Sequence, residues 1–246
     1  MMVQLIKKYG VVFFCFVLLN GCKKSGCFEN AGTIKKSERL VTNFNTIDIK
    51  DNINLILTQD TINKLFVEAG ENIAPNIKTE IANGVLTIKN EASCKWLRNP
   101  SENITVYLNV KDLIRINYNG SGNITSTNTI VADGITFYTD NGAGTIDIDL
   151  NAKRTYAYIF NDNTDMIFQG NSDSCYVYTG ERGTIDFRDF VVKNQTVGYG
   201  SIRDGYVHAT ESLNVIMYFK GTLYYKGNPG KVTTEYISTG RVIPFR

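Results

Sequence analysis

The chain has 246 residues, 43% of them hydrophobic, which is enough to bury the core of one sizeable domain. Its formal net charge is only +2 at pH 7. Proteins that bind nucleic acid carry strongly basic surfaces, so this balance argues against a nucleic-acid partner. Histidine occurs once, which leaves little material for a histidine-based metal or catalytic centre.

Residues 1–21 have the pattern of an export signal. Lys7 and Lys8 precede a nine-residue apolar run, whereas about 20 apolar residues are needed to cross a bilayer. The run leads into Leu19-Asn20-Gly21-Cys22, which resembles the lipobox of bacterial lipoproteins. We therefore expect cleavage before Cys22, lipidation of its thiol and anchoring at the cell envelope, most simply at the outer membrane. The alternative is an ordinary signal peptide with an incidental cysteine.

Residues 22–40 are polar and lack periodicity, so they are expected to form a lipidated N-terminus followed by a tether. Loss of Lys7 and Lys8 with the signal would bring the formal charge of the mature chain to zero. Three thiols then remain besides that of Cys22, and an exported protein can form disulfides. Cys175 lies in an alternating strand pattern typical of a small core residue, while spacing leaves a bridge between Cys27 and Cys94 open.

The stretch 41–110 contains strand patterns at irregular spacing. Between residues 77 and 90 the pair Asn83-Gly84 separates two alternating runs, which predicts a hairpin because Asn-Gly tolerates the positive φ of a type I′ turn. We expect 41–110 to be the less regular half of a single domain, 41–246. It would cap the open end of the regular half, 111–246, and hide its sheet edge.

A unit of glycine, one polar residue and one apolar residue recurs through the regular half. The copies begin 22, 20, 19, 17, 21 and 19 residues apart, a period typical of solenoids. The third copy has threonine in place of glycine. The seven apolar positions are Ile124, Ile146, Met166, Ile185, Ile202, Leu223 and Val242.

Within each copy, apolar and polar residues alternate as in a half-buried strand. A repeat that buries one face cannot fold alone, so neighbouring copies are expected to stack their apolar positions in columns. The sequence predicts an all-β fold, a right-handed parallel β-helix with about 20 residues per rung. We also expect the glycines to supply positive φ at the corners. A β-sandwich of antiparallel strands is the alternative.

Tyrosine recurs in nearly every copy, and Tyr138, Tyr158 and Tyr178 are candidates for a binding platform on adjacent rungs. The competing interpretation is that they are half-buried residues that stabilise the sheet. Asp147 and Asp186 occupy equivalent places two copies apart, at about 10 Å, close to the separation of carboxylates in inverting glycosidases. The simpler interpretation is that both aspartates are charged residues on the solvent-exposed face of their strands.

No catalytic constellation is recognisable. His208, the single histidine, has no second imidazole or thiol at ligand spacing, so neither a metal site nor a cofactor is expected. The glycine pairs near residues 120 and 142 are expected at corners, because no helix follows them to bind a phosphate.

Strand and turn patterns occur together in the segments 44–49, 53–59, 67–73, 83–89, 104–108 and 113–124. In combination they resemble the auto-transporter adhesin family called the head GIN domain, and the resemblance extends to about residue 243. The resemblance implies a β-solenoid-like fold at the cell envelope and a binding or adhesive role, and it brings no catalytic residues. A tyrosine platform would suit a glycan or a protein as the ligand. A carbohydrate-active β-helix enzyme that uses Asp147 and Asp186 is the alternative function.

Overall fold

The structure is a computed structural model that describes residues 30–92, 103–160 and 163–245. The predicted export signal, the predicted lipidation site Cys22 and the two thiols of Cys27 and Cys94 lie outside the described residues.

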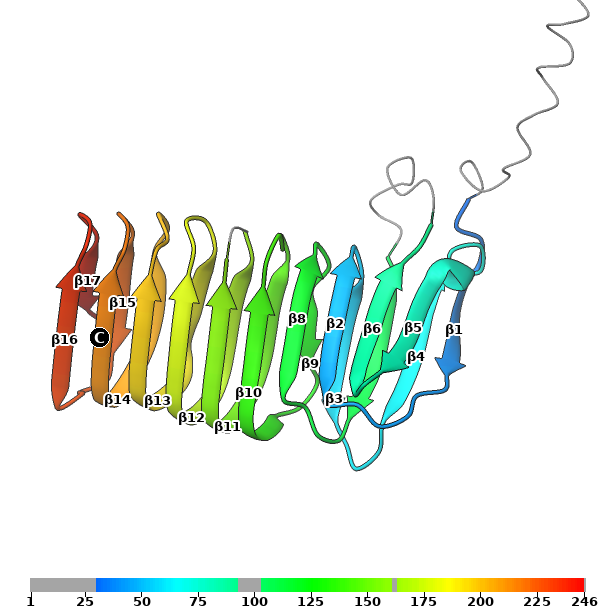
Figure 1. Cartoon of the computed structure of the whole chain (residues 1–246), viewed down its shortest axis with the longest axis horizontal. Helices are drawn as coiled ribbons and strands as arrows, with labels where there is room; N and C mark the ends of the chain where they lie inside the picture. The colour runs from blue at the N-terminus through cyan, green and yellow to red at the C-terminus, as the bar shows by residue number, and fades with distance from the viewer. Residues whose placement is uncertain (1–29, 93–102, 161–162, 246) are drawn as a thin grey trace, which may run out of the picture.

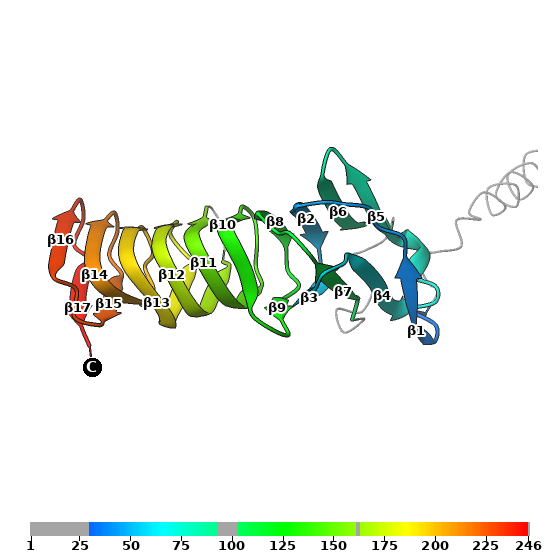
Figure 2. The ribbon, with the colours of Figure 1, turned by 90° about the horizontal axis from the view of Figure 1, so that it is seen from below.

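The described residues form strands stacked along one long axis in two facing sheets, followed at the N-terminal end by antiparallel strands (Figures 1 and 2). The strands are β1 (Ile34–Arg39), β2 (Thr46–Asp51), β3 (Asn54–Gln59), β4 (Lys64–Gly70), β5 (Ile77–Ala82), β6 (Val85–Asn90), β7 (Thr105–Val110), β8 (Arg115–Gly120), β9 (Ile124–Ser126), β10 (Ile130–Thr139), β11 (Thr145–Ile159), β12 (Asp165–Thr179), β13 (Thr184–Tyr199), β14 (Gly205–Met217), β15 (Thr222–Lys226), β16 (Lys231–Tyr236) and β17 (Arg241–Pro244). A single 3₁₀ turn, η1 (Ala74–Asn76), follows β4.

Each long strand serves both sheets. β11 pairs in parallel with β9 through its start and with β10 through the rest of its length, and β14 pairs with β15 and then with β16 in the same way. We call the sheet through β2, β8, β10 and the ends of β11–β14 the first sheet. The second sheet runs through β3, β9 and the starts of β11–β14. The parallel ladders confirm the solenoid with about 20 residues per rung, and the β-sandwich alternative is wrong.

The N-terminal half contributes two rungs as well as a cap. β2 lies between β6 and β8, and β3 lies between β7 and β9, all in parallel. Strands earlier in the chain are therefore inserted between later ones. The antiparallel pairings among the described residues are those of β1 with β4, β4 with β7 and β5 with β6, and they form an irregular cap at this end. β4 and β5 lie in the stretch expected to form the cap. β1 lies within residues 22–40, where a tether was predicted, and it is a strand because its backbone pairs with β4. The predicted hairpin is confirmed between β5 and β6, with φ of 52° and 77° at Asn83 and Gly84.

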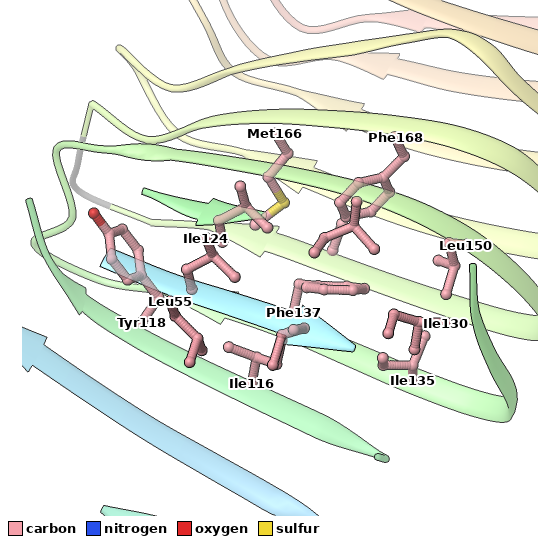
Figure 3. Close-up of a cluster of buried hydrophobic side chains, with 14 of the residues drawn as sticks. Leu55, Ile116, Tyr118, Ile124, Ile130, Ile135, Phe137, Leu150, Met166 and Phe168 are labelled. Carbon is pink, nitrogen blue, oxygen red and sulfur yellow. The ribbon is translucent and has the colours of Figure 1, made fainter. Parts of the chain in front are cut away.

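The core is built of columns of inward side chains, one from each rung (Figure 3). In the second sheet Leu55, Ile124, Ile146 and Met166 are neighbours in consecutive strands, and all four are fully buried. In the first sheet Ile47, Ile116 and Phe137 belong to an equivalent buried column. The stacked inward side chains thus make one continuous core, and each rung depends on its neighbours to bury them.

The fifth copy of the repeat does not have the predicted inward residue. Ile202 is 56% exposed, and its place in the column is taken by Gly205, which pairs with Leu223. The buried ring of Tyr199 fills the volume that a side chain at Gly205 would occupy. With Gly205 in the column, successive inward positions are 22, 20, 19, 20, 18 and 19 residues apart. The inward positions are therefore spaced more evenly than the repeat glycines.

The repeated glycines are required for a different reason from the one expected. Among the described glycines only Gly32, Gly84, Gly170 and Gly227 have positive φ, and none belongs to the repeat. A β-carbon at Gly122 would instead lie against the carbonyl oxygen of Ile53 on the adjacent rung, and repeat glycines further along meet backbone carbonyls in the same way. The corners are therefore packed so closely that a side chain does not fit there.

Cys175 is buried in the core, as predicted for it. Burial raises the pKa of its thiol to about 12, although a hydrogen bond with Gln195 acts in the opposite direction. The thiol is therefore protonated at neutral pH and serves as a small apolar group.

Candidate ligand-binding surface

The register of the first sheet brings three candidate tyrosines into one column. Tyr138 pairs with Tyr158 and Tyr158 pairs with Tyr178, on β10, β11 and β12. Each is partly exposed on the outer face of the sheet, because their neighbours along the strand point into the core. A second outward column places Tyr156 beside Tyr176.

These rings form a continuous surface with two further aromatics. Phe160 contacts Tyr138, Tyr158 and Tyr178, with ring centroids 5.4, 6.1 and 5.2 Å away. Tyr158 also contacts Tyr176 at 5.6 Å. We call this surface the aromatic strip, which comprises Tyr138, Tyr156, Tyr158, Phe160, Tyr176, Tyr178 and Tyr218.

The strip extends to β14 because one position in the column has no side chain. Gly198 follows Tyr178 in the ladder, and Tyr218 leans over it to reach the ring of Tyr178 at 6.0 Å. A β-carbon at Gly198 would lie 3.1 Å from the Tyr218 ring and 3.2 Å from the Tyr178 ring. The edge rings Tyr156, Tyr176 and Tyr218 remain 38%, 38% and 42% exposed, so a ligand can reach them.

A polar hollow of about 340 Å³ adjoins the strip at Tyr138. Arg115 spans the junction, because its guanidinium lies 5.4 Å from the centre of the Tyr138 ring and its Nε donates to Asn117 at 2.7 Å. The lining therefore offers amide, carboxylate and cationic groups directly beside aromatic rings. It comprises Asp48, Lys50, Arg115, Asn117, Tyr118, Asn119, Tyr138 and Asp140.

The phenol of Tyr158, at the centre of the strip, acts as a neutral hydrogen-bonding group. The pKa of Tyr158 is raised chiefly by burial and further by the neighbouring Tyr176 and Tyr156, while Arg115 lowers it. Its hydroxyl therefore stays protonated at neutral pH. The strip thus offers apolar ring faces together with hydroxyl groups that can donate and accept hydrogen bonds.

The two candidate carboxylates lie on the outer face of the second sheet, away from the strip. Asp147 and Asp186 are separated in the ladder by Ile167, as predicted from the sequence. Asp186 accepts a hydrogen bond from Arg188 Nε at 2.8 Å and forms an ion pair with the same guanidinium. That hydrogen bond is the main cause that lowers the pKa of Asp186, so this carboxyl is held ionised and is a poor general acid.

The single histidine is on the same face as Asp186. His208 Nδ1 lies 3.3 Å from the carbonyl oxygen of Arg188, and its pKa is lowered, first by burial and then by Lys226. Within residues 30–92, 103–160 and 163–245, no three histidine, cysteine or acidic side chains are grouped as metal ligands. The same residues contain no helix long and apolar enough to cross a membrane.

Sequence reasoning identified the central tyrosines but missed Phe160, Arg115 and the polar hollow. Phe160 directly follows β11 and continues the alternation of Tyr156 and Tyr158, so the alternation alone predicts that it shares their face. Arg115 could not be found in this way, because it reaches the strip only through the stacking of β8 on β10.

These features define a class of protein: a parallel β-solenoid whose outer face presents an aromatic and polar surface suited to binding. The chain belongs to the family described as "Putative auto-transporter adhesin, head GIN domain", whose model matches residues 43–229. Membership in this family indicates a binding protein of the cell surface or envelope. No curated protein matches the chain.

Solved structures share the fold. A structure named a putative adhesin from Bacteroides fragilis has a TM-score of 0.81 at 20% identity, over 87% of this chain and 97% of that one. Another, from Parabacteroides distasonis, has a TM-score of 0.65 at 19% identity, over 87% and 98%. A third, from the same species and named a putative lipid binding protein, has a TM-score of 0.61 at 16% identity, over 87% and 98%. At these identities the similarity concerns the fold.

Proposed function

We propose that this chain is a non-catalytic, lipid-anchored binding protein of the bacterial envelope and that the aromatic strip binds a glycan. The observation that supports this most is the continuity of the strip. Seven rings cover adjacent strands from β10 to β14 on one outer face and border a polar hollow.

The chemistry of the strip and the hollow favours a sugar as the ligand. Sugar rings present apolar C–H faces that pack on aromatic rings, and their hydroxyls require donors and acceptors at the rim. Asp48, Asn117 and Arg115 supply those groups beside Tyr138. The column Tyr138, Tyr158 and Tyr178 crosses two strand spacings, about 10 Å, which suits an extended glycan better than a single sugar ring.

Replacing Tyr158 and Tyr178 together by alanine is expected to lower glycan affinity by roughly 5-fold to 150-fold, since each ring contact contributes about 0.5–1.5 kcal/mol. The matched control is Tyr224→Ala, because Tyr224 belongs to a separate aromatic pair with Tyr206 on the second sheet. Binding of the full-length chain to a glycan array identifies the ligand, and titration calorimetry with that ligand measures the loss.

Equal binding by the double variant and the wild type would contradict the glycan site. Retention of only a protein or a phospholipid vesicle, with no glycan retained, would assign the strip to a different ligand and also contradict the proposal. A reducing-sugar assay on the same glycans tests the enzymatic alternative. Release of sugar that is abolished by Asp186→Asn would show catalysis at the second sheet.

The anchoring part of the proposal depends on Cys22 and has its own test. Cys22→Ser is expected to abolish incorporation of labelled palmitate and to move the protein from the membrane fraction to the soluble fraction. The control is Cys175→Ser, whose thiol is buried in the core and is not expected to accept lipid. Unchanged labelling of the Cys22→Ser variant would show that the lipobox prediction is wrong.

A further inference from the structure

The two ends of the solenoid differ in whether their outermost strands are covered by further strands. At the N-terminal end the antiparallel strands β1, β4 and β5 follow the last rung. At the other end, β16 pairs with β14 and β17 pairs with β15, and the described residues supply neither with a partner on its outer edge (Figure 1). An unpaired strand edge presents a row of free N–H and C=O groups.

The core is also uncovered at this end. Val232 and Tyr236 continue the buried columns of Leu213 and Met217, but they are 41% and 54% exposed because the described residues place no rung beyond them. Each earlier rung buries these positions under the next one. The last rung therefore presents both open backbone groups and apolar side chains to whatever lies beyond it.

The hydrogen-bond pattern shows which groups of β16 are open. The N–H of Ile237 donates to Met217 O at 3.0 Å, so Ile237 faces β14. Successive residues of a strand direct their backbone groups to alternate sides. Val232, Thr234 and Tyr236 thus point their N–H and C=O groups to the free edge.

We infer that β16 is a docking edge for a second copy of this chain, with two β16 strands paired antiparallel about a two-fold axis at Thr233. In this register Val232 of each copy lies opposite Thr234 of the other. These are the residues whose backbone groups are open, so both strands complete their hydrogen bonds.

The charges of β16 match the same register. Lys231 of one copy lies opposite Glu235 of the other, twice by symmetry, at the closely spaced non-hydrogen-bonded positions. Both side chains are exposed, and neither forms an ion pair within the described part of its own chain. A strand that complements its own reversed copy in both charge and hydrogen bonding selects a second copy over an unrelated segment. Pro244 has no N–H to donate, so we assign the pairing to β16 and not to β17.

A charge-exchange experiment tests this pairing. Sedimentation velocity of the full-length chain in detergent is expected to show a dimer. Lys231→Glu alone and Glu235→Lys alone are each expected to shift the protein to monomer, because like charges then face each other. A mixture of the two single variants is expected to recover a dimer, since every facing pair is again opposite in sign. Monomer for the wild type, or no recovery on mixing, would overturn the inference.

A disulfide supplies an independent measurement. Thr233→Cys would place two thiols across the axis on α-carbons about 4.5 Å apart, within the range for a disulfide. Thr196→Cys is the matched control, because Thr196 lies in the same outward column two rungs away from the edge. Rapid crosslinking of the Thr233→Cys variant alone supports the pairing, and equal rates for the two variants would contradict it.

In each copy, residue 30 lies at the end of the solenoid opposite to β16 (Figure 1). In such a dimer the N-terminal ends of the two solenoids would therefore be farthest from each other. Copies anchored on facing cells would then meet at their tips. This last step relies on the anchoring proposed for Cys22, whereas the charge-exchange and crosslinking experiments do not.

Discussion

Replacing Phe168 by alanine is expected to lower the free energy of unfolding by about 3–5 kcal/mol, the usual range for a buried phenylalanine. The Phe168 ring is 1% exposed and stacks on Phe187 at 4.6 Å and 8°. It also meets Phe137 at 4.6 Å, which belongs to the opposite sheet (Figure 3). Loss of this ring leaves a cavity where the two sheets meet, between the side chains of β10, β12 and β13.

Phe160→Ala is the matched control, because it removes the same kind of ring from the outer face, at the residue that follows β11. There the loss of a partly exposed ring is expected to cost much less stability while weakening ligand binding through the strip. Urea denaturation followed by circular dichroism measures the midpoint and slope for both variants. If Phe168→Ala and Phe160→Ala lowered stability equally, the core would not be organised around the phenylalanine stack.

Period and alternation were enough to predict the solenoid, because a rung that buries one face repeats its inward residue at a near-constant interval. They gave the wrong inward residue at Ile202. The repeat glycine locates the corner of the rung, and the residue that faces the core, Gly205, has no side chain, so no apolar pattern identifies it. The volume that identifies Gly205 is filled by Tyr199, six positions earlier in the sequence. That one side chain fills the space left by another residue can be seen only in the three-dimensional structure.

The order of the rungs was also beyond reach of the sequence. β2 and β3 have the same alternation as β6, β7, β8 and β9, so their pattern predicts a rung but not its neighbours. The cap was therefore predicted to be larger than it is. This order also affects the candidate site, because Asp48 on β2 lines the polar hollow only through the insertion of β2 beside β8.

For the tyrosines, alternation shows which residues share a face within one strand, but the register between strands decides which rings touch. Tyr138, Tyr158 and Tyr178 recur at intervals of 20 residues, which equals the rung length, and this made them candidates. Tyr218 keeps the same interval, two steps of 20 beyond Tyr178, but the register pairs Gly198 with Ile216. Tyr218 therefore lies beside the column and joins the strip only because Gly198 leaves room for it.

Replacing Gly144 by alanine is expected to lower the free energy of unfolding by about 1–3 kcal/mol or more, although the change adds one methyl group to a strand-rich chain. That methyl would lie against the carbonyl oxygen of Gly122 and the hydroxyl of Tyr118. The same two groups share a hydrogen bond of 2.7 Å, from Tyr118 Oη to Gly122 O. The methyl can be accommodated only if this bond lengthens and the two rungs move apart.

Gly134→Ala separates this effect from the general consequences of glycine replacement. Gly134 lies in β10, and the nearest atom to its added methyl, Arg154 Nε, is 3.8 Å away, an ordinary contact. There alanine is expected to be neutral or to stabilise by up to about 1 kcal/mol, since it restricts the unfolded chain. The two variants have the same composition, so any difference in their urea midpoints comes from position. If both changed stability alike, close approach between rungs would not be what requires glycine at the corners.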